Sequence, residues 1–108
     1  MDKPNTNALI LDTTTNVSVV QLPGRAFPGS VVQGDSLFIL LHSAEEIRKM
    51  AKPHNDSELE GCLDELVESL YWRFRHYTDV VVQNGGNVPE QWMEYADAIG
   101  KRLAATGP

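Results

Sequence analysis

Residues 22–37 read Leu22-Pro-Gly-Arg-Ala-Phe-Pro-Gly-Ser-Val-Val-Gln-Gly-Asp-Ser-Leu37, and this stretch separates two parts of the chain with different patterns. Its two Pro-Gly pairs predict tight turns, because proline restricts φ and glycine adopts positive φ. The pairs flank Arg25 and Phe27. Two interpretations of these residues stay open. They form a structural corner, in which Arg25 pairs with a carboxylate such as Asp35 and Phe27 covers one end of the helices, or they present a binding site.

The part before and within this stretch has short β-type runs. Apolar and β-branched residues predict strands at 8–12, 17–22 and 30–33, separated by short polar or Pro-Gly connections. Connections of this length are too short for a parallel crossover. The sequence therefore predicts a small antiparallel β-meander of two to three strands.

After the stretch, apolar residues recur at helical spacing. The first helix is expected to begin at Asp35 or Ser36, either of which can cap it, and to end before Pro53. Its expected core-facing stripe is Leu37, Leu40, Leu41, Ala44, Ile47 and Ala51. Glu45 and the charged residues that follow it are expected on the solvent side.

Two more helices follow. The sequence Ser57-Glu58-Leu59-Glu60 is typical of a capping box, and Asn84-Gly85-Gly86 ends the second helix. Its expected stripe is Leu59, Leu63, Leu66, Leu70, Phe74, Tyr77 and Val81. A third helix begins near Pro89, a residue favoured at the first helical position. Two positions stay open for Trp72: it packs on this helix and forms an aromatic cluster with Trp92 and Tyr95, or it lies at an interface.

These patterns predict an α+β fold in which the meander is followed by an antiparallel helical hairpin and a third C-terminal helix. A length of 108 residues predicts a single domain, residues 1–108, with residues 1–7 and 104–108 frayed.

Composition narrows the functional class. The net charge of −6 argues against a nucleic-acid partner, which requires a basic face, and favours a basic protein partner. A single cysteine, Cys62, excludes an intramolecular disulfide and fits a reducing compartment. We find no apolar run long enough to span a membrane and no secretory signal, so we expect a cytoplasmic protein without a membrane partner.

No constellation in the sequence indicates catalysis. His42 precedes Glu45 and Glu46 by three and four residues, but metal sites require more ligands than this spacing supplies. Cys62 lies beside the expected core stripe, where a buried and inert thiol is expected. We therefore predict a non-enzymatic protein with no catalytic, cofactor-binding or metal-binding residues.

The clearest asymmetry in the distribution of charge is a segment that contains acidic residues but no basic ones. No lysine or arginine occurs at residues 53–72, which contain Asp56, Glu58, Glu60, Asp64, Glu65 and Glu68. Helix capping accounts for the first of these residues, but Glu65 and Glu68 lie too far into the helix for that explanation. The acidic residues form either a solvated face or a docking patch for a basic surface. Trp72 lies off the apolar stripe and is the better interface candidate of the two tryptophans.

The quoted stretch, from Leu22-Pro-Gly-Arg-Ala-Phe-Pro-Gly29 to Gln33-Gly-Asp-Ser-Leu37, resembles an uncharacterised family of small bacterial proteins. The resemblance covers about residues 17–81 and implies a strand, this loop and an amphipathic helical hairpin, with no established catalytic residues. The third helix falls outside it. In size, charge and architecture the chain also resembles the immunity proteins that are encoded beside bacterial polymorphic toxins.

The functional prediction follows from these features. We expect a cytoplasmic binding protein, an immunity protein that occludes the active site of a cognate toxin, with a homodimer that pairs through the second helix as the alternative. The predicted partner-binding residues are Glu58, Asp64, Glu65, Glu68, Trp72, Arg25 and Phe27.

Overall fold

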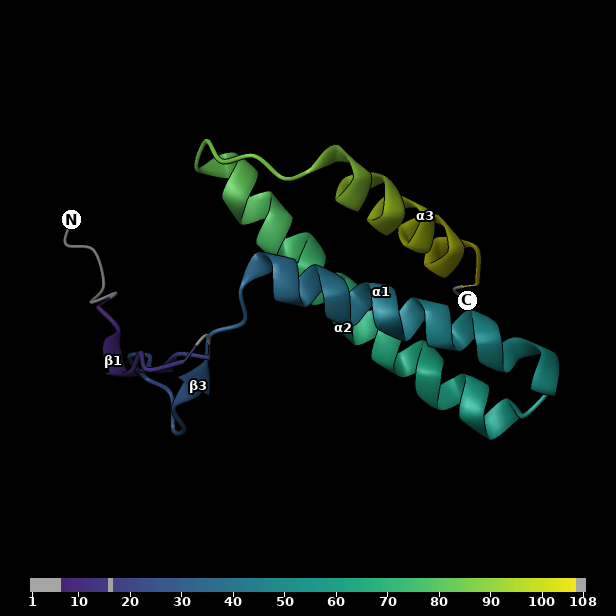
Figure 1. The fold of residues 1–108 in the computed structure, drawn as a ribbon, viewed down its shortest axis with the longest axis horizontal. Helices are drawn as coiled ribbons and strands as arrows, with labels where there is room; N and C mark the ends of the chain where they lie inside the picture. Colours follow the sequence, from purple (N-terminus) through teal and green to yellow (C-terminus); the bar gives the residue numbers. More distant parts are fainter. Residues whose placement is uncertain (1–6, 16, 107–108) are drawn as a thin grey trace. The chain divides into compact units, whose positions relative to one another are not determined.

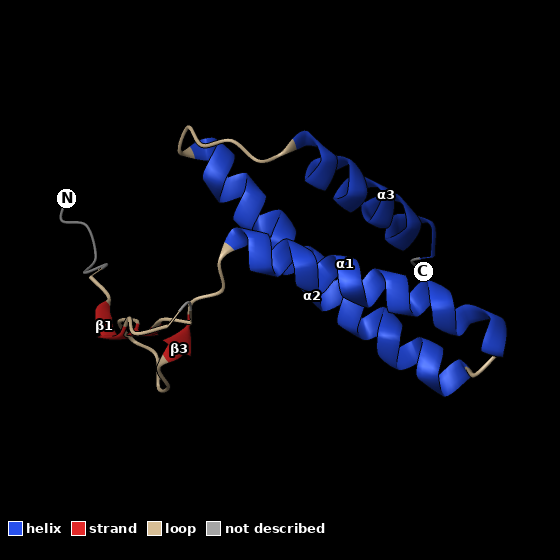
Figure 2. Ribbon diagram, in the orientation of Figure 1, coloured by secondary structure: helices blue, strands red, loops and turns tan. Residues whose placement is uncertain are grey.

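The computed structural model describes residues 7–15 and 17–106. The chain divides into two compact units, one up to Gln33 and one from Gly34 onward, and each is described by itself. A three-stranded antiparallel sheet precedes three helices, which confirms the predicted α+β fold (Figures 1 and 2).

The first unit is the predicted meander. Its strands β1 (Leu9–Asp12), β2 (Val19–Gln21) and β3 (Gly29–Ser30) are antiparallel and lie in the order β1-β2-β3. The third strand is shorter than predicted, but the Val31 N–H donates to the Ser18 carbonyl at 2.8 Å and continues the pairing by one hydrogen bond. The strands are short because the turn residues begin within two or three residues of each strand end.

The second unit begins with α1 (Gly34–Ala51), which starts one residue earlier than predicted. Asp35 lies in its first turn and accepts a hydrogen bond from the Ser36 N–H. A Cβ at Gly34 would overlap the phenol of Tyr77, so glycine at this position lets the second helix approach closely. Pro53 ends α1 as predicted and lies in a short 3₁₀ helix, η1 (Lys52–His54).

The longest element is α2 (Ser57–Gln83), which runs back along α1. Its N-cap is Asp56, whose carboxylate accepts from the Leu59 N–H at 3.0 Å, so the predicted capping box with Ser57 as the cap is wrong. Aspartate is as good an N-cap residue as serine. Asn55, which precedes Asp56, has a left-handed backbone conformation and completes the turn between the two helices. At the other end Gly85 has φ +83° and the Gly86 N–H donates to the Val81 carbonyl, the glycine stop that the sequence indicated.

The third helix, α3 (Glu90–Thr106), extends to residues that were expected to be frayed. The expectation of frayed ends at residues 1–6 and 107–108 lies outside the described residues. Tyr71 packs against α3 at Gly100, where a Cβ would overlap its phenol. A glycine that weakens an isolated helix therefore has a packing reason here.

The core of this unit lies where the three helices meet, and it contains Leu37, Leu41, Ala44, Val67, Tyr71, Phe74, Ala96 and Ile99. Two predicted stripes need correction, because Leu40 and Ile47 of α1 and Leu59 and Leu66 of α2 are exposed. The predicted α2 stripe was rotated from the true core, which uses Val67, Tyr71 and Thr78. The spacing of apolar residues along α1 and α2 could not show which flank of each helix packs against α3 and which flank is exposed.

An aromatic cluster joins α3 to the helical hairpin. Trp92 of α3 stacks on Phe38 of α1 with ring centroids 4.9 Å apart, and Tyr95 packs beside Phe38 and His42. The Trp92 ring also lies 6.5 Å from that of Phe74 on α2, so the cluster joins α3 to both α1 and α2. The ring contact of Trp72 is with its neighbour Tyr71. None of the helices in the described part of the chain has the length and apolar content needed to cross a bilayer.

Candidate functional site

The predicted acidic residues of α2 separate into two groups. Glu58, Glu65 and Trp72 recur at seven-residue spacing, about two helical turns, and Glu68 lies one turn before Trp72. All four side chains are exposed. We call these four residues the α2 outer surface.

Trp72 is the largest apolar group on that surface. It is 59% exposed, and its ring makes an edge contact with Tyr71 at 5.1 Å between centroids. Tyr71 is in turn buried against α3 at Gly100. The indole is thus supported on one side and open on the other, the arrangement of an aromatic interface anchor.

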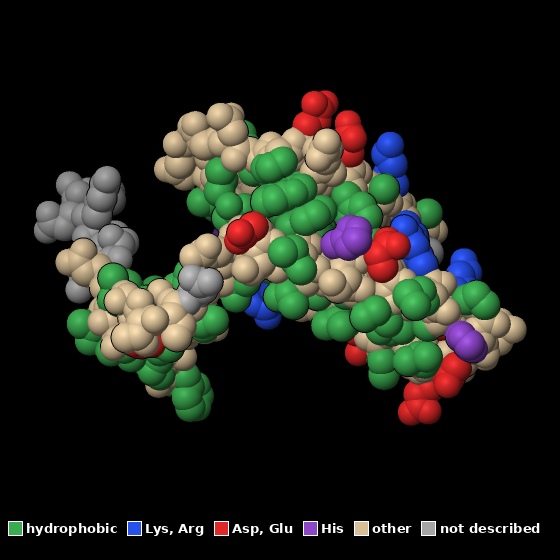
Figure 3. Space-filling view, viewed as in Figure 1, with side chains coloured by type: hydrophobic (Ala, Val, Ile, Leu, Met, Phe, Trp, Pro, Cys, Tyr) green, Lys and Arg blue, Asp and Glu red, His purple; other side chains and the backbone are tan. Residues whose placement is uncertain are grey.

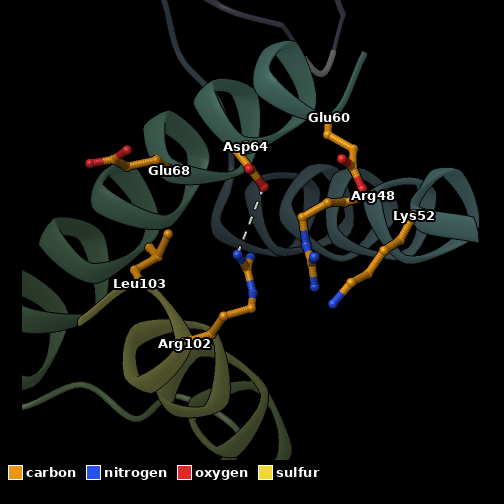
Figure 4. A pocket seen from close by; sticks show the side chains of 7 residues that line it. All are labelled: Arg48, Lys52, Glu60, Asp64, Glu68, Arg102 and Leu103. Carbon is orange, nitrogen blue, oxygen red and sulfur yellow. Dashed lines mark ion pairs between the residues drawn. The ribbon is translucent and has the colours of Figure 1, made fainter. Parts of the chain in front are cut away.

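Asp64 belongs to a different environment. It lines a pocket of about 330 Å³ with Glu60 and Glu68 of α2, Arg48 and Lys52 from α1 and η1, and Arg102 and Leu103 of α3. The Asp64 Oδ1 lies 3.9 Å from Arg102 Nη1. Figure 4 shows the nitrogen ends of Arg48, Lys52 and Arg102 directed into the space between the helices, whereas the Glu68 carboxylate points away from them. Asp64 therefore already faces a cation within its own chain.

A buried glutamate holds the two arginines of this pocket. Glu45 is 4% exposed and accepts from Arg48 Nε at 2.6 Å and from Arg102 Nη2 at 2.8 Å. The hydrogen bond to Glu45 raises the pKa of the Arg48 guanidinium above its usual range. The expectation that Glu45 lies on the solvent side is wrong, because its two arginine partners compensate the cost of burying the carboxylate. This network of side chains connects α1 to α3. The ion pairs that line the pocket therefore brace the two helices against each other.

A second polar cluster joins α1 to α3 beside His42. The Glu46 carboxylate accepts from the Tyr95 hydroxyl at 2.7 Å and from Lys49 Nζ at 3.1 Å, and the His42 ring packs on Tyr95 with centroids 4.8 Å apart. The hydrogen bond from Tyr95 lowers the pKa of Glu46, while burial and the same bond raise the pKa of Tyr95 above its usual range. The lowered pKa of Glu46 and the raised pKa of Tyr95 favour the ionised carboxylate and the neutral phenol that make this hydrogen bond.

The other predicted anchors belong to the sheet unit. A turn closes from Leu22 to Arg25, with the Arg25 N–H donating to the Leu22 carbonyl at 3.3 Å and Gly24 at φ +75°. The Gln21 amide donates to the Arg25 carbonyl at 2.8 Å, which fixes the backbone of the loop. The Arg25 side chain is exposed and Phe27 is 82% exposed.

The cysteine and the side chains that could ligate a metal also bear on chemistry. Cys62 is exposed, which corrects the expectation of a buried thiol. It lies on the α2 flank that the true core leaves open. Within residues 7–15 and 17–106, no group of three or more histidine, cysteine or acidic side chains is arranged to hold a metal ion.

Sequence reasoning missed the Glu45–Arg102 pair. The spacing of Glu45 and Arg48 is a local signal for an ion pair, but nothing in the sequence indicates that Arg102 reaches back across 57 positions.

One comparison of this sequence with known proteins gives a match. A family model described as a family of unknown function, DUF6959, matches residues 3–89, and the match ends before α3 begins. No curated protein and no solved structure matches the chain. The match agrees with the resemblance to an uncharacterised family, and the chain belongs to the family of unknown function DUF6959.

Proposed function

We propose that this chain is a non-enzymatic, cytoplasmic binding protein that docks a basic protein surface on the α2 outer surface. In its specific form, the partner is a cognate bacterial toxin whose active site the chain occludes, as immunity proteins do. The observation that carries the proposal is the open indole of Trp72, 59% exposed, on the same helical face as the exposed carboxylates of Glu65 and Glu68.

The two kinds of group have separate roles. Aromatic anchors at the centre of an interface contribute about 2 kcal/mol or more when they are buried by a partner. Carboxylates around such an anchor increase the association rate with a basic partner and disfavour acidic ones. Glu58 extends the charged surface by two turns toward the helix start.

The remaining predicted residues contribute differently. Asp64 lies 3.9 Å from Arg102, so part of its charge is compensated before any partner arrives. It therefore contributes less to binding than Glu65 or Glu68. Arg25 and Phe27, exposed on a loop with a hydrogen-bonded turn, are separate anchor candidates.

Support for a toxin as the partner comes from the acidic charge of −6 and from the likeness in size and architecture to immunity proteins. A basic nucleic-acid-cleaving active site is the kind of surface that such a charge complements.

The proposal is tested by producing the chain together with the product of the gene adjacent to its own. The expected result is co-purification of the two products and rescue of growth when that product is toxic. Replacing Trp72→Ala together with Glu68→Lys should abolish both. If the double variant still co-purifies and still protects, the α2 outer surface is not the binding site.

A further inference from the structure

One glycine of α2 has no packing role among the described residues of the chain. Gly61 is exposed near the start of the helix, and a Cβ built on it would meet no atom within 4 Å. Gly34 and Gly100, the other two glycines within the described helices, each make room for the phenol of a tyrosine from another helix. Glycine weakens a helix interior relative to alanine, and at Gly61 no contact within the described chain accounts for that cost.

Gly61 lies among the carboxylates of the α2 outer surface. Glu58 is three residues before it and Glu65 is four residues after it, so both are its neighbours on the surface of the helix. Both side chains are exposed, and neither forms an ion pair with a described residue of the chain. Figure 3 shows acidic side chains projecting from the first turns of α2. A strip of bare backbone therefore lies between two negative charges that the described chain does not compensate.

The two charges select the kind of group that fits this strip. The phenols at Gly34 and Gly100 lie between packed helices, whereas Gly61 is exposed and flanked by carboxylates. A guanidinium is planar and weakly hydrated, so it can lie flat on a helix backbone that carries no Cβ. Its fork of N–H donors can also bond carboxylates on two sides. The ammonium of lysine is compact and strongly hydrated, so it gains less from the absence of a side chain.

We infer that Gly61 forms the seat for an arginine side chain of the basic partner, whose guanidinium lies on the α2 backbone and donates to Glu58 and Glu65. This assignment rests on the function proposed above and specifies the partner group that the α2 outer surface recognises. At 1.5 Å per residue, Glu58 and Glu65 are about 10 Å apart along the helix axis, with the seat between them. The seat is about 16 Å from Trp72 along the same axis, so one partner of ordinary size can contact both.

The test is a calorimetric titration of the full chain with the product of the adjacent gene. Gly61→Ala should weaken binding at least roughly fivefold and Gly61→Leu at least roughly fiftyfold, because the added carbons lift the guanidinium off the backbone. Gly61→Ala should at the same time raise the temperature of thermal unfolding, since its Cβ meets no atom, so a loss of binding is not a loss of folding.

Cys62→Leu is the matched control for Gly61→Leu. It places the same side chain on the neighbouring exposed residue, about 100° around the helix from the seat. Its affinity should stay within about twofold of that of the native chain, because the added side chain does not cover the backbone at Gly61.

A double-mutant cycle separates the seat from a general effect of charge. Glu58→Gln should weaken binding about fivefold in the native chain but less than about twofold in Gly61→Leu, because the arginine has already been displaced there. Treating the partner with phenylglyoxal, which blocks arginine side chains, should make it bind the native chain and Gly61→Leu alike.

Three results would overturn the assignment and leave the proposed function intact. They are native affinity in both Gly61 variants, additive losses in the cycle, and a difference between the native chain and Gly61→Leu that persists after phenylglyoxal treatment. Failure of the native chain to bind would instead overturn the proposed function, and the seat with it.

Discussion

Glu45 on α1 accepts a hydrogen bond from Arg102 on α3 with 2.8 Å between Oε1 and Nη2, although only 5% of the Glu45 side chain is exposed. The same carboxylate accepts from Arg48. A single buried charge thus joins the hairpin to α3, which lies outside the region matched by the family model.

Glu45→Gln should lower the free energy of unfolding by about 2 kcal/mol. Removing one partner from a buried ion pair costs about 3–5 kcal/mol, and the partial exposure of Arg48 and Arg102, at 13% and 25%, reduces that cost. Urea denaturation measures the change. Glu94→Gln, on an exposed position of α3, is the control and should change stability by less than about 0.5 kcal/mol. Equal effects of the two substitutions would show that Glu45 is not a brace.

Gly100→Ala and Gly61→Ala should change stability in opposite directions. Alanine in a helix interior is favoured over glycine by roughly 1 kcal/mol, and a Cβ at Gly61 meets no atom, so Gly61→Ala should stabilise the chain. A Cβ at Gly100 would overlap the phenol of Tyr71, so Gly100→Ala should destabilise it. Thermal unfolding checks both signs. Tyr71→Phe should recover part of the loss in the Gly100→Ala background, and no recovery would place the cost elsewhere.

The hydrogen bond between Tyr95 and Glu46 should make stability depend on pH on the acid side. Because the bond lowers the pKa of Glu46 in the folded chain, its contribution is present above the usual glutamate pKa of 4.5 and is lost as the pH falls through the lowered value. Tyr95→Phe should therefore destabilise the chain most near neutral pH, and the difference from the native chain should shrink below pH 4.5. Urea denaturation from about pH 3 to 8 measures it. A difference that is constant across this range would contradict the prediction.

The two tryptophans should respond differently to truncation. Trp92 stacks on Phe38, so Trp92→Ala should cost about 3 kcal/mol of stability. Trp72 is 59% exposed, so Trp72→Ala should cost less than about 1 kcal/mol. Urea denaturation of the two variants compares these costs directly. A large cost at Trp72 would mean that its indole is needed for folding and would weaken its assignment as a binding anchor.

The order of elements was predictable because its signals are local. The Pro-Gly pairs, the glycines after Gln83 and the spacing of the leucines each act within a few residues, and they indicated the meander, the hairpin and α3. The rotation of each helix was not predictable. Leu66 and Val67 both satisfy a helical stripe, and only packing against α3 decides that Val67 is buried and Leu66 exposed.

The candidate site was predictable to a similar degree. Trp72 departs from the apolar spacing, and the run without lysine or arginine from residue 53 to 72 stands out in the sequence. The sequence could not separate Asp64 from Glu65, because the cation that faces Asp64 comes from Arg102, on another helix. The burial of Glu45 could not be predicted either, because its partner Arg102 also lies on another helix.

The central claim is that the α2 outer surface binds a basic partner through Trp72, Glu65 and Glu68. Its most direct test is a calorimetric titration of the chain with the product of the adjacent gene, comparing Glu65→Lys/Glu68→Lys with Glu90→Lys/Glu94→Lys. Glu90 and Glu94 are exposed on α3, and either double reversal removes the same amount of negative charge, so long-range attraction is matched. We predict that the first variant binds at least roughly tenfold more weakly, about 1.4 kcal/mol, and that the second binds within about twofold of the native chain. Equal weakening by both variants, or no binding by the native chain, would contradict the account.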